Sequence, residues 1–364
     1  MNWLRNSPLA LTIWAAVIAL AFAAVITSIV LSATGIDPFY AFSQMGSFGA
    51  EPDSVANMLN RGTTYYLSAL AVAIGFRMNL FNIGVDGQYQ LSALMAAAFG
   101  GAVVLPPGLA QIAIIVVGML TGAAWAAIPA ILKATRGVSE VIATIMLNSI
   151  ATGVIAYFLT PGRFGYRVEG SNNIGTKPIP GSGQVPGIPF PGSGTQVFGL
   201  IILAILIGGA YALVLRRTRF GFDLRATGLS PSAALASGVH AKRMVVATMV
   251  SSGAVAGLVG MPQLLGESHQ YSLDFPAGIG FTGIAIALLG RNSAVGMAFA
   301  ALLWAFLDQS AQILDLNEIP KEVVAITQAT VVLSVVVVYE VVHRLGLKYQ
   351  QQAVGAVLGE EAVR

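Results

Sequence analysis

The amino-acid sequence predicts an all-α membrane protein with about ten transmembrane helices, with its N- and C-termini in the cytoplasm. Only 10% of the 364 residues are charged and 56% are hydrophobic, and the mean hydropathy is +0.77. Soluble domains carry about 25% charged residues, so this chain is too poor in charge to cover a water-facing surface. The apolar runs are continuous rather than alternating, which favours helices over the strands of a membrane barrel.

Each helix is predicted from an apolar run of suitable length. The first run is too long for the core of a secretory signal, which spans about 7–15 residues, so it is expected to be a retained span. The eighth is short and punctuated by glycines, a pattern found both in discontinuous helices beside a solute path and in close helix packing. Gly253 and Gly257, four residues apart in the seventh, favour packing. The predicted ranges are 9–33, 63–79, 88–105, 108–131, 139–160, 196–215, 244–265, 276–290, 294–314 and 323–342.

The orientation follows from the basic residues. Threading ten spans with the N-terminus inside places 14 of the 19 lysine and arginine residues on the cytoplasmic side, as the positive-inside rule requires. Residues 1–364 are then expected to form a single transmembrane domain with a cytoplasmic tail at 345–364. The five basic residues left outside are Arg61, Arg163, Arg167, Lys177 and Lys321.

Two long segments lie on the predicted outer side. Residues 35–61 are expected to include an amphipathic surface helix. Residues 161–195 are rich in proline and glycine, which make turns rather than helices. This outer Pro/Gly-rich loop is equally compatible with a solvated linker and with a functional segment, either a cap over the outer mouth or a dock for another protein, because long ordered loops tend to be functional.

The inside loop 216–243 predicts two short helices joined by a tight turn. Asp223 is a candidate cap for the first helix, which would end at Gly228. Ser230, Pro231 and Gly238 are the residues expected before, at the start of and just past the second helix. Leu229, Leu235 and Val239 would then lack a lipid or core partner and suit a groove on another cytoplasmic protein. An ordinary basic loop explains the arginines but not the paired, capped helices.

The pattern GFDLRATGLSPSAALASGV, residues 221–239, resembles the coupling segment of ATP-binding-cassette (ABC) importer permeases for nucleosides, simple sugars and branched-chain amino acids. The resemblance implies that this segment transmits closure of a separate ATPase to the spans. The residues that match the family pattern are Gly221, Leu224, Arg225, Ala226, Gly228, Pro231, Ala233, Ala234 and Gly238.

Two further segments carry the same resemblance. FNIGVDGQ, residues 81–88, is similar to an N-I-G-x-E-G-Q segment, with Asp86 where glutamate is usual. GVSEVIATIMLNSIA, residues 137–151, resembles a segment of nucleoside-type permeases, and the long outer loop resembles the larger permease of those systems. The resemblance implies a permease domain in a bacterial cytoplasmic membrane, an ABC ATPase, a non-identical second permease and an extracytoplasmic solute-binding protein. Simple-sugar or branched-chain amino acid transport is the alternative.

Polar residues inside the apolar runs are candidates for a substrate path. Asn82, Asp86 and Gln88 lie at a glycine-broken segment, and Asn148 lies in the middle of the fifth predicted span. In lipid such groups must find partners or line water. They are therefore expected either to contact the solute or to tie neighbouring helices together.

Other polar residues have simpler explanations. Asp308 and Gln309 lie near the outer end of the ninth span, where snorkelling to the interface competes with a functional role. A second set of polar residues precedes the short eighth span and is compatible with either an outer gate or a solvated loop. These residues are Glu267, His269, Gln270 and Tyr271.

Several function classes are disfavoured by what the sequence lacks. It has no cysteine and no phosphate-binding loop G-x-x-x-x-G-K-[ST]. The three histidines lie far apart, unlike metal-ligand spacing. The chain is therefore predicted not to be an enzyme and to hold no cofactor or metal, with ATP bound by the partner ATPase. It is also predicted to bind no nucleic acid, because its basic residues are not clustered on a soluble surface. An ion-coupled carrier, the less favoured alternative, would need acids deep in the bundle.

Overall fold

The computed structural model describes residues 8–167, 170, 172–317, 319–320, 322–338, 341 and 344. The predicted tail at 345–364 lies outside the described residues. The chain divides into two compact units. The terminal unit comprises Met1–Gly49 and Leu307–Arg364, and the central unit comprises Ala50–Phe306. Each unit is described by itself.

Each of the ten predicted ranges overlaps a helix, although the second helix begins at Pro52 rather than at residue 63 and the seventh ends at Ala256 rather than at residue 265. The described part of the chain holds four helices long and apolar enough to cross a membrane, or up to six if each bent pair is one span. The all-α membrane class follows from these helices, whereas the number of spans stays a prediction. The helices are α2 (Pro8–Ala33), α4 (Pro52–Phe76), α5 (Val85–Ala102), α6 (Leu109–Arg136), α7 (Glu140–Phe158), α8 (Ile201–Arg217), α11 (Ala241–Ala256), α13 (Ile279–Leu289), α14 (Ala294–Leu316) and Glu322–Val338.

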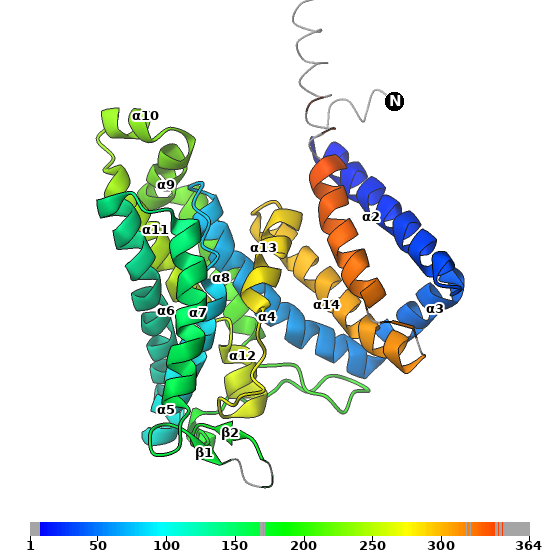
Figure 1. The fold of residues 1–364 in the computed structure, drawn as a ribbon, viewed down its shortest axis with the longest axis horizontal. Helices are drawn as coiled ribbons and strands as arrows, with labels where there is room; N and C mark the ends of the chain where they lie inside the picture. The colour runs from blue at the N-terminus through cyan, green and yellow to red at the C-terminus, as the bar shows by residue number, and fades with distance from the viewer. Residues whose placement is uncertain are drawn as a thin grey trace, which may run out of the picture. The chain divides into compact units, whose positions relative to one another are not determined.

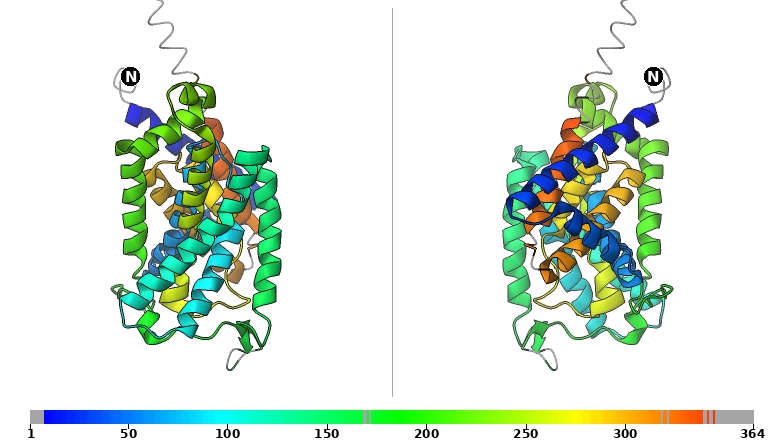
Figure 2. Two further views of the ribbon diagram at one scale, coloured as in Figure 1. Left: turned by 90° about the vertical axis from the view of Figure 1, so that its left-hand side faces the viewer. Right: turned by 90° about the vertical axis from the view of Figure 1, so that its right-hand side faces the viewer.

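The central unit is a bundle built around α4 and α5. Their large side chains, including Leu67, Leu70 and Leu94, are fully buried. The helices run side by side, with a short hairpin at one end and two small helices at the other (Figures 1 and 2). On the flanking helices the outward side chains are apolar, as Leu120 and Ile205 illustrate at 64% and 65% exposure. An apolar exterior of this kind fits lipid contact rather than water.

Glycines allow α6 and α11 to pack backbone against backbone. A Cβ added at Gly257 would lie 2.2 Å from the Gly118 carbonyl oxygen, and one added at Gly122 would lie 2.2 Å from that of Gly253. The packing interpretation of the Gly253 and Gly257 pair is therefore supported, because small residues let membrane helices approach closely.

We expect Gly257→Leu to lower the yield of folded protein in the membrane, because a side chain forced against a backbone typically costs about 1–3 kcal/mol and often more. The measurement is the monodisperse fraction after detergent extraction and heating. Gly153→Leu on α7 is the matched control, since a Cβ there meets nothing within 4 Å. Equal behaviour of the two variants would contradict the packing role.

The outer loop is ordered along residues 265–271, which follow α11 in the chain. It forms the hairpin β1 (Tyr166–Arg167) and β2 (Ile174–Gly175) and a turn η1 (Gly181–Gly183). Backbone N–H groups of Thr176, Ile179 and Val185 donate to the carbonyls of Tyr271, His269 and Leu265 at 2.7–2.8 Å. The geometry therefore favours an ordered segment over a solvated linker, and its role as a cap or a dock stays a prediction.

Asp53, in the first turn of α4, holds the far end of this loop. Its Oδ1 accepts hydrogen bonds from the Ser193 hydroxyl at 2.5 Å and from the Gly194 and Thr195 N–H groups at 2.9 and 3.1 Å. These bonds, of which the one from Ser193 has the largest effect, hold the pKa of Asp53 below its ordinary value because they favour the ionised carboxylate.

The terminal unit contains α2, α3 (Pro38–Gly49) and the helix Glu322–Val338. Helix α3 confirms the helix expected within 35–61, with Met45 buried and Phe39 exposed. The hydroxyl groups of Thr27 and Thr327 form a hydrogen bond of 3.0 Å. Asp308 accepts a hydrogen bond of 2.7 Å from the Gln328 amide, which gives this acid a structural partner, and Gln309 is buried.

Candidate functional site

The inside loop forms the predicted pair of short helices, α9 (Arg219–Leu229) and α10 (Pro231–Ala236). As predicted, Ser230 caps α10 by accepting from the Ala233 N–H at 3.3 Å, and Gly238 has a φ of +83° just past its end. The prediction that Asp223 caps α9 is wrong. Thr218 is the cap and accepts from the Gly221 N–H at 3.1 Å, so Asp223 lies inside the helix.

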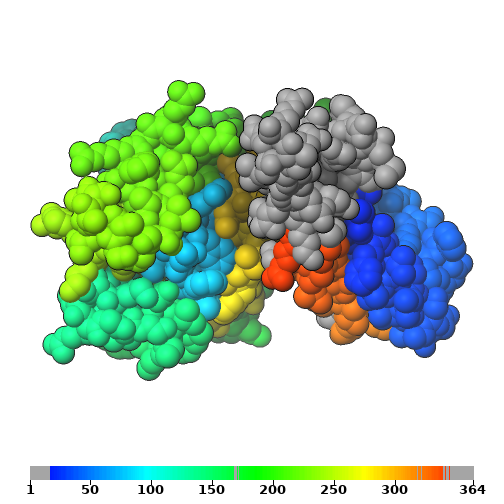
Figure 3. Space-filling model, turned by 90° about the horizontal axis from the view of Figure 1, so that it is seen from above, coloured from blue at the N-terminus to red at the C-terminus, as the bar shows by residue number. Residues whose placement is uncertain are grey.

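Helices α9 and α10 have one buried face and one apolar exposed face. Leu224 is fully buried and Ala234 is 3% exposed, whereas Phe222 and Leu235 are each 61% exposed and Leu229 is 88% exposed. We call Phe222, Leu229 and Leu235 the coupling knob. It belongs to the yellow-green segment on the face of the central unit shown in Figure 3. Val239 was expected to lack a core partner, but it is 9% exposed and joins the core.

The residues that match the family pattern divide between the two faces. Gly221, Leu224 and Ala234 are buried, Arg225, Ala226 and Gly228 are half-buried, and Pro231, Ala233 and Gly238 are exposed. A Cβ at Gly221 would lie 2.3 Å from the Val214 carbonyl oxygen. The glycine therefore permits α9 to turn back closely against α8.

Helix α9 is attached to the turn that follows α4. The Asn79 side-chain amide donates to the Gly228 carbonyl at 2.8 Å. A Cβ at Gly228 would lie 2.8 Å from both the Arg77 carbonyl oxygen and the Met78 Cα. Asn79 has a φ of +54°, a left-handed conformation that asparagine tolerates. The end of α9 and the 77–79 turn are thus in close contact.

The same turn is attached to the end of α13. The Arg77 Nη2 donates to the Asn292 carbonyl at 2.6 Å, and the Tyr211 hydroxyl donates to the same oxygen at 2.8 Å. We call Arg77, Asn79, Tyr211, Gly228 and Asn292 the inner relay. It connects α9 with the C-terminal ends of α4 and α13.

The polar candidates Asn82 and Gln88 bind each other. Their side-chain amides exchange two hydrogen bonds at 2.9 and 3.0 Å. Asn82 also donates to the Ser252 hydroxyl at 2.9 Å, which in turn donates to the Ala71 carbonyl at 2.6 Å. This chain ties the loop after α4 to α5, α11 and α4.

Asp86 and Asn148 also bind protein groups. Asp86 accepts from the Gly280 N–H at 3.1 Å and from the Gln90 amide at 2.8 Å. The Asn148 amide accepts from Gly87 N–H and donates to the Ile83 carbonyl, both at 3.0 Å. All four candidates lie around the start of α5 with their polar atoms engaged, so the helix-tying alternative has direct geometric support and a solute contact stays a prediction.

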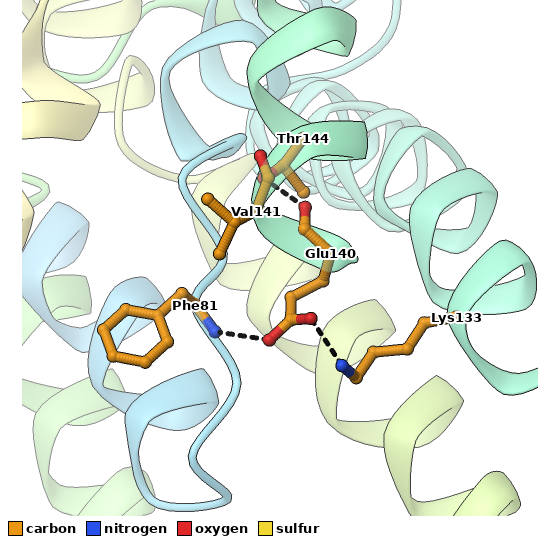
Figure 4. A network of polar contacts seen from close by, with 5 residues as sticks. All are labelled: Phe81, Lys133, Glu140, Val141 and Thr144. Atoms are coloured by element: carbon orange, nitrogen blue, oxygen red, sulfur yellow. Dashed lines mark hydrogen bonds and ion pairs between the residues drawn. The ribbon is translucent and has the colours of Figure 1, made fainter. Parts of the chain in front are cut away.

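An ion pair fixes the start of α7 beside this region (Figure 4). The Glu140 carboxylate forms an ion pair with the Lys133 ammonium at 2.5 Å and accepts a hydrogen bond from the Phe81 N–H at 3.4 Å. Glu140 is 9% exposed in its side chain, and it lies in the first turn of α7, where a negative charge is favourable. The segments 81–88 and 137–151 are therefore neighbours in space.

A polar cavity of about 640 Å³ opens in the central unit, within the range of about 300–1,000 Å³ typical of ligand pockets. Four segments contribute to its wall: the N-terminal half of α4, the residues before α8, residues 263–267 beyond the end of α11, and the start of α13. The lining residues are Asn57, Asn60, Arg61, Thr64, Tyr65, Thr195, Gln196, Phe198, Gln263, Gly266, Glu267, Pro276, Ala277, Gly278, Ile279 and Thr282.

Irregular backbone surrounds the cavity. After α12 (Met261–Gln263) the chain makes a π-helical turn, η2 (Leu264–Ser268), and then His269 at a φ of +50°. Single π turns inside helices are frequently found at functional sites. Helix α13 begins only at Ile279, after Gly278 at a φ of +85°. The short, glycine-rich eighth span therefore starts at the cavity.

The sequence indicated part of this cavity and missed the rest. Glu267 lines it, but His269 and Tyr271 instead hold the outer loop through their backbone carbonyls. Asn57, Asn60, Arg61 and Thr64 were missed, although their spacing of three and four residues is that of one helix face. Hydropathy predicts the start of the second span at residue 63, so Asn57, Asn60 and Arg61 fall in the predicted outer segment 35–61 and only Thr64 falls in the span.

Within the described residues, no group of three or more histidine, cysteine, aspartate or glutamate side chains is placed to hold a metal ion.

Comparison with known proteins gives consistent relatives. The family described as branched-chain amino acid transport system / permease component matches residues 54–341. The chain is 33% identical to the nucleoside ABC transporter permease protein NupB of Lactococcus lactis, over 88% of this chain and 89% of NupB. It is 34% identical to the guanosine ABC transporter permease protein NupP of Bacillus subtilis, over 94% of this chain and 97% of NupP.

A third relative is the glucose ABC transporter permease protein TsgB13 of Haloferax volcanii, 30% identical over 91% of this chain and 87% of TsgB13. The first two bacteria each also have a more distant relative. The nucleoside ABC transporter permease protein NupC of Lactococcus lactis is 25% identical over 73% of this chain and 85% of NupC. The guanosine ABC transporter permease protein NupQ of Bacillus subtilis is 27% identical over 66% of this chain and 76% of NupQ. No solved structure matches the chain significantly.

Proposed function

Because the chain belongs to the branched-chain amino acid transport system / permease component family, we propose that it carries nucleosides as the permease subunit of an ABC importer. The permease role follows from the family, and ATP hydrolysis belongs to a separate subunit. The nucleoside assignment is supported by NupB and NupP, which match over most of both chains. The single structural observation that supports the permease role is the capped pair α9–α10 with its exposed coupling knob.

The coupling role is proposed for the residues that match the family segment. In this proposal the knob binds the ATPase, and the buried face, including Gly221, Leu224 and Ala234, carries its motion inward. The remaining members of the segment are Arg225, Ala226, Gly228, Pro231, Ala233 and Gly238. The shape supports this, because three exposed apolar side chains on a polar loop suit a groove on a partner.

The assembly contains two further proteins in our proposal. A non-identical second permease is supported by the paired relatives NupB with NupC and NupP with NupQ. A solute-binding protein would deliver nucleoside to the outer side, where the ordered loop 161–195 offers a surface. Residues 1–364 act together as one permease domain, with no cofactor bound in this chain.

The proposed topology has ten spans in a bacterial cytoplasmic membrane, with both termini inside. The excess of lysine and arginine on the inner side supports it. In this topology the short helices α13 and Glu322–Val338 each count as one of the ten spans. Asn82, Asp86, Gln88 and Asn148 are proposed to position α5 beside the path.

A sugar is the second candidate solute, because TsgB13 is named as a glucose permease. Branched-chain amino acids come third, through the description of the family.

Uptake tests the proposed function. Cells that lack this gene should lose import of labelled adenosine and uridine but keep import of ribose and leucine, and the gene should restore the loss. Uptake should also survive collapse of the ion gradients while ATP is maintained, which an ion-coupled carrier would not allow. Loss of ribose or leucine uptake instead would overturn the nucleoside assignment and keep the importer.

A further inference from the structure

We infer that the polar cavity of the central unit is the site where this permease holds its solute, and that its lining selects a neutral molecule with a flat ring and hydrogen-bonding edges. This inference rests on the proposed function, because it takes nucleosides as the solute. It moves the solute contact away from Asn82, Gln88 and Asn148, whose amides are already bonded to protein.

Two amides in the wall are available to a ligand. Within the described residues, the side chains of Asn57 and Gln263 make no hydrogen bond, and both are half-buried. A carboxamide offers both donors and an acceptor, which is the complement of a nucleobase edge. Asn60, in contrast, is committed to the wall, because it donates to the Gln196 carbonyl at 2.9 Å and accepts from the Phe198 N–H at 2.7 Å.

The other lining groups suit the rest of such a solute. Tyr65 and Phe198, each 9% exposed, contribute aromatic atoms to the wall. The Thr64 and Thr282 hydroxyl groups donate to the Asn60 and Gly278 carbonyls at 3.5 and 3.4 Å, and their oxygens can still accept hydrogen bonds from ribose hydroxyl groups. One guanidinium, Arg61, and one carboxylate, Glu267, line the same cavity. Their opposite charges leave the lining without net charge, so a neutral nucleoside is favoured over a nucleotide.

The cavity is also placed where transport could change it. Its wall is formed by the N-terminal half of α4 and the start of α13, and the other ends of these two helices meet at the inner relay. A shift of either helix would alter the cavity. A static pocket on the bundle surface would lack this connection.

The absence of cysteine from the chain allows a direct test. Gln263→Cys and Thr282→Cys place a thiol in the wall, and Asn172→Cys places one on the exposed hairpin as the control. The complex in membranes is treated with the membrane-permeant thiol reagent N-ethylmaleimide, with and without saturating uridine. We expect uridine to slow alkylation of both cavity thiols severalfold and to leave the hairpin thiol unchanged. Glucose should protect less than uridine.

Uptake by the unaltered chain separates the two proposals. If the unaltered chain imports uridine while uridine leaves alkylation of both cavity thiols unaltered, the cavity is not the solute site, although the permease carries nucleosides. If the unaltered chain imports no nucleoside and glucose alone protects the cavity thiols, the ring selectivity inferred here and the nucleoside assignment both fail.

Discussion

A chain in which Leu229 and Leu235 are both replaced by aspartate is expected to import no nucleoside, although it reaches the membrane at the usual level. These side chains are 88% and 61% exposed, and exposed substitutions usually change stability by no more than about 0.5 kcal/mol. In a groove of the ATPase, each leucine would contribute about 1.5–3 kcal/mol. Loss of both, with two charges to desolvate, should weaken ATPase binding by at least about 100-fold.

The measurement is recovery of the ATPase with tagged permease, together with nucleoside uptake. Leu273→Asp is the matched control, because Leu273 is 62% exposed and lies in the segment that pairs with the outer loop, away from α9 and α10. It should keep ATPase binding. Normal recovery of the ATPase with the Leu229 and Leu235 double variant would show that the coupling knob is not the docking surface.

The coupling loop shows how far capping chemistry can be read from sequence. Ser230, Pro231 and Gly238 mark the limits of α10 because each acts on its own backbone neighbours. The prediction that Asp223 caps α9 is wrong because Thr218 caps the helix one turn earlier. Asp223 instead lies four residues after Arg219, and its carboxylate is 3.8 Å from the Arg219 Nε. The prediction that Val239 lacks a core partner is wrong because its burial depends on the return of the chain to α11. That tertiary contact cannot be read from the neighbouring residues in the sequence.

The cavity could be predicted only in part for a related reason. A polar stripe on one helix face is visible in the sequence around Asn57 and Asn60. That Gln263, Phe198 and Thr282 meet this stripe depends on packing among four segments far apart in the chain. Similarly, Asn82 and Gln88 are close enough in sequence to suggest a pair, but their link to Ser252 is not. Polar groups with local partners were therefore predictable, and those with distant partners were not.

Replacing Arg77 with methionine is expected to uncouple ATP hydrolysis from transport. The Arg77 guanidinium joins the turn that contacts α9 to the Asn292 carbonyl at the end of α13. A hydrogen bond from a charged group contributes about 1.5–3 kcal/mol, so its loss should allow α9 to move without moving α13. Nucleoside uptake should then fall about 10- to 100-fold. ATPase recovery and uridine protection of a Thr282→Cys thiol should remain, since neither site is altered.

The informative readout is the ATPase rate of the purified complex with and without uridine, because a merely unstable variant would lose both rates together. Arg77→Met should keep the basal rate and lose its response to uridine. Arg77→Lys retains a donor and should restore part of the response, whereas Arg136→Met removes an exposed cation from the end of α6 and should behave as the unaltered chain. If Arg77→Met keeps its response, the motion of α9 must reach the cavity through the Asn79 contact and α4 alone. Asn79→Ala in the Arg77→Met background would then be the variant that uncouples.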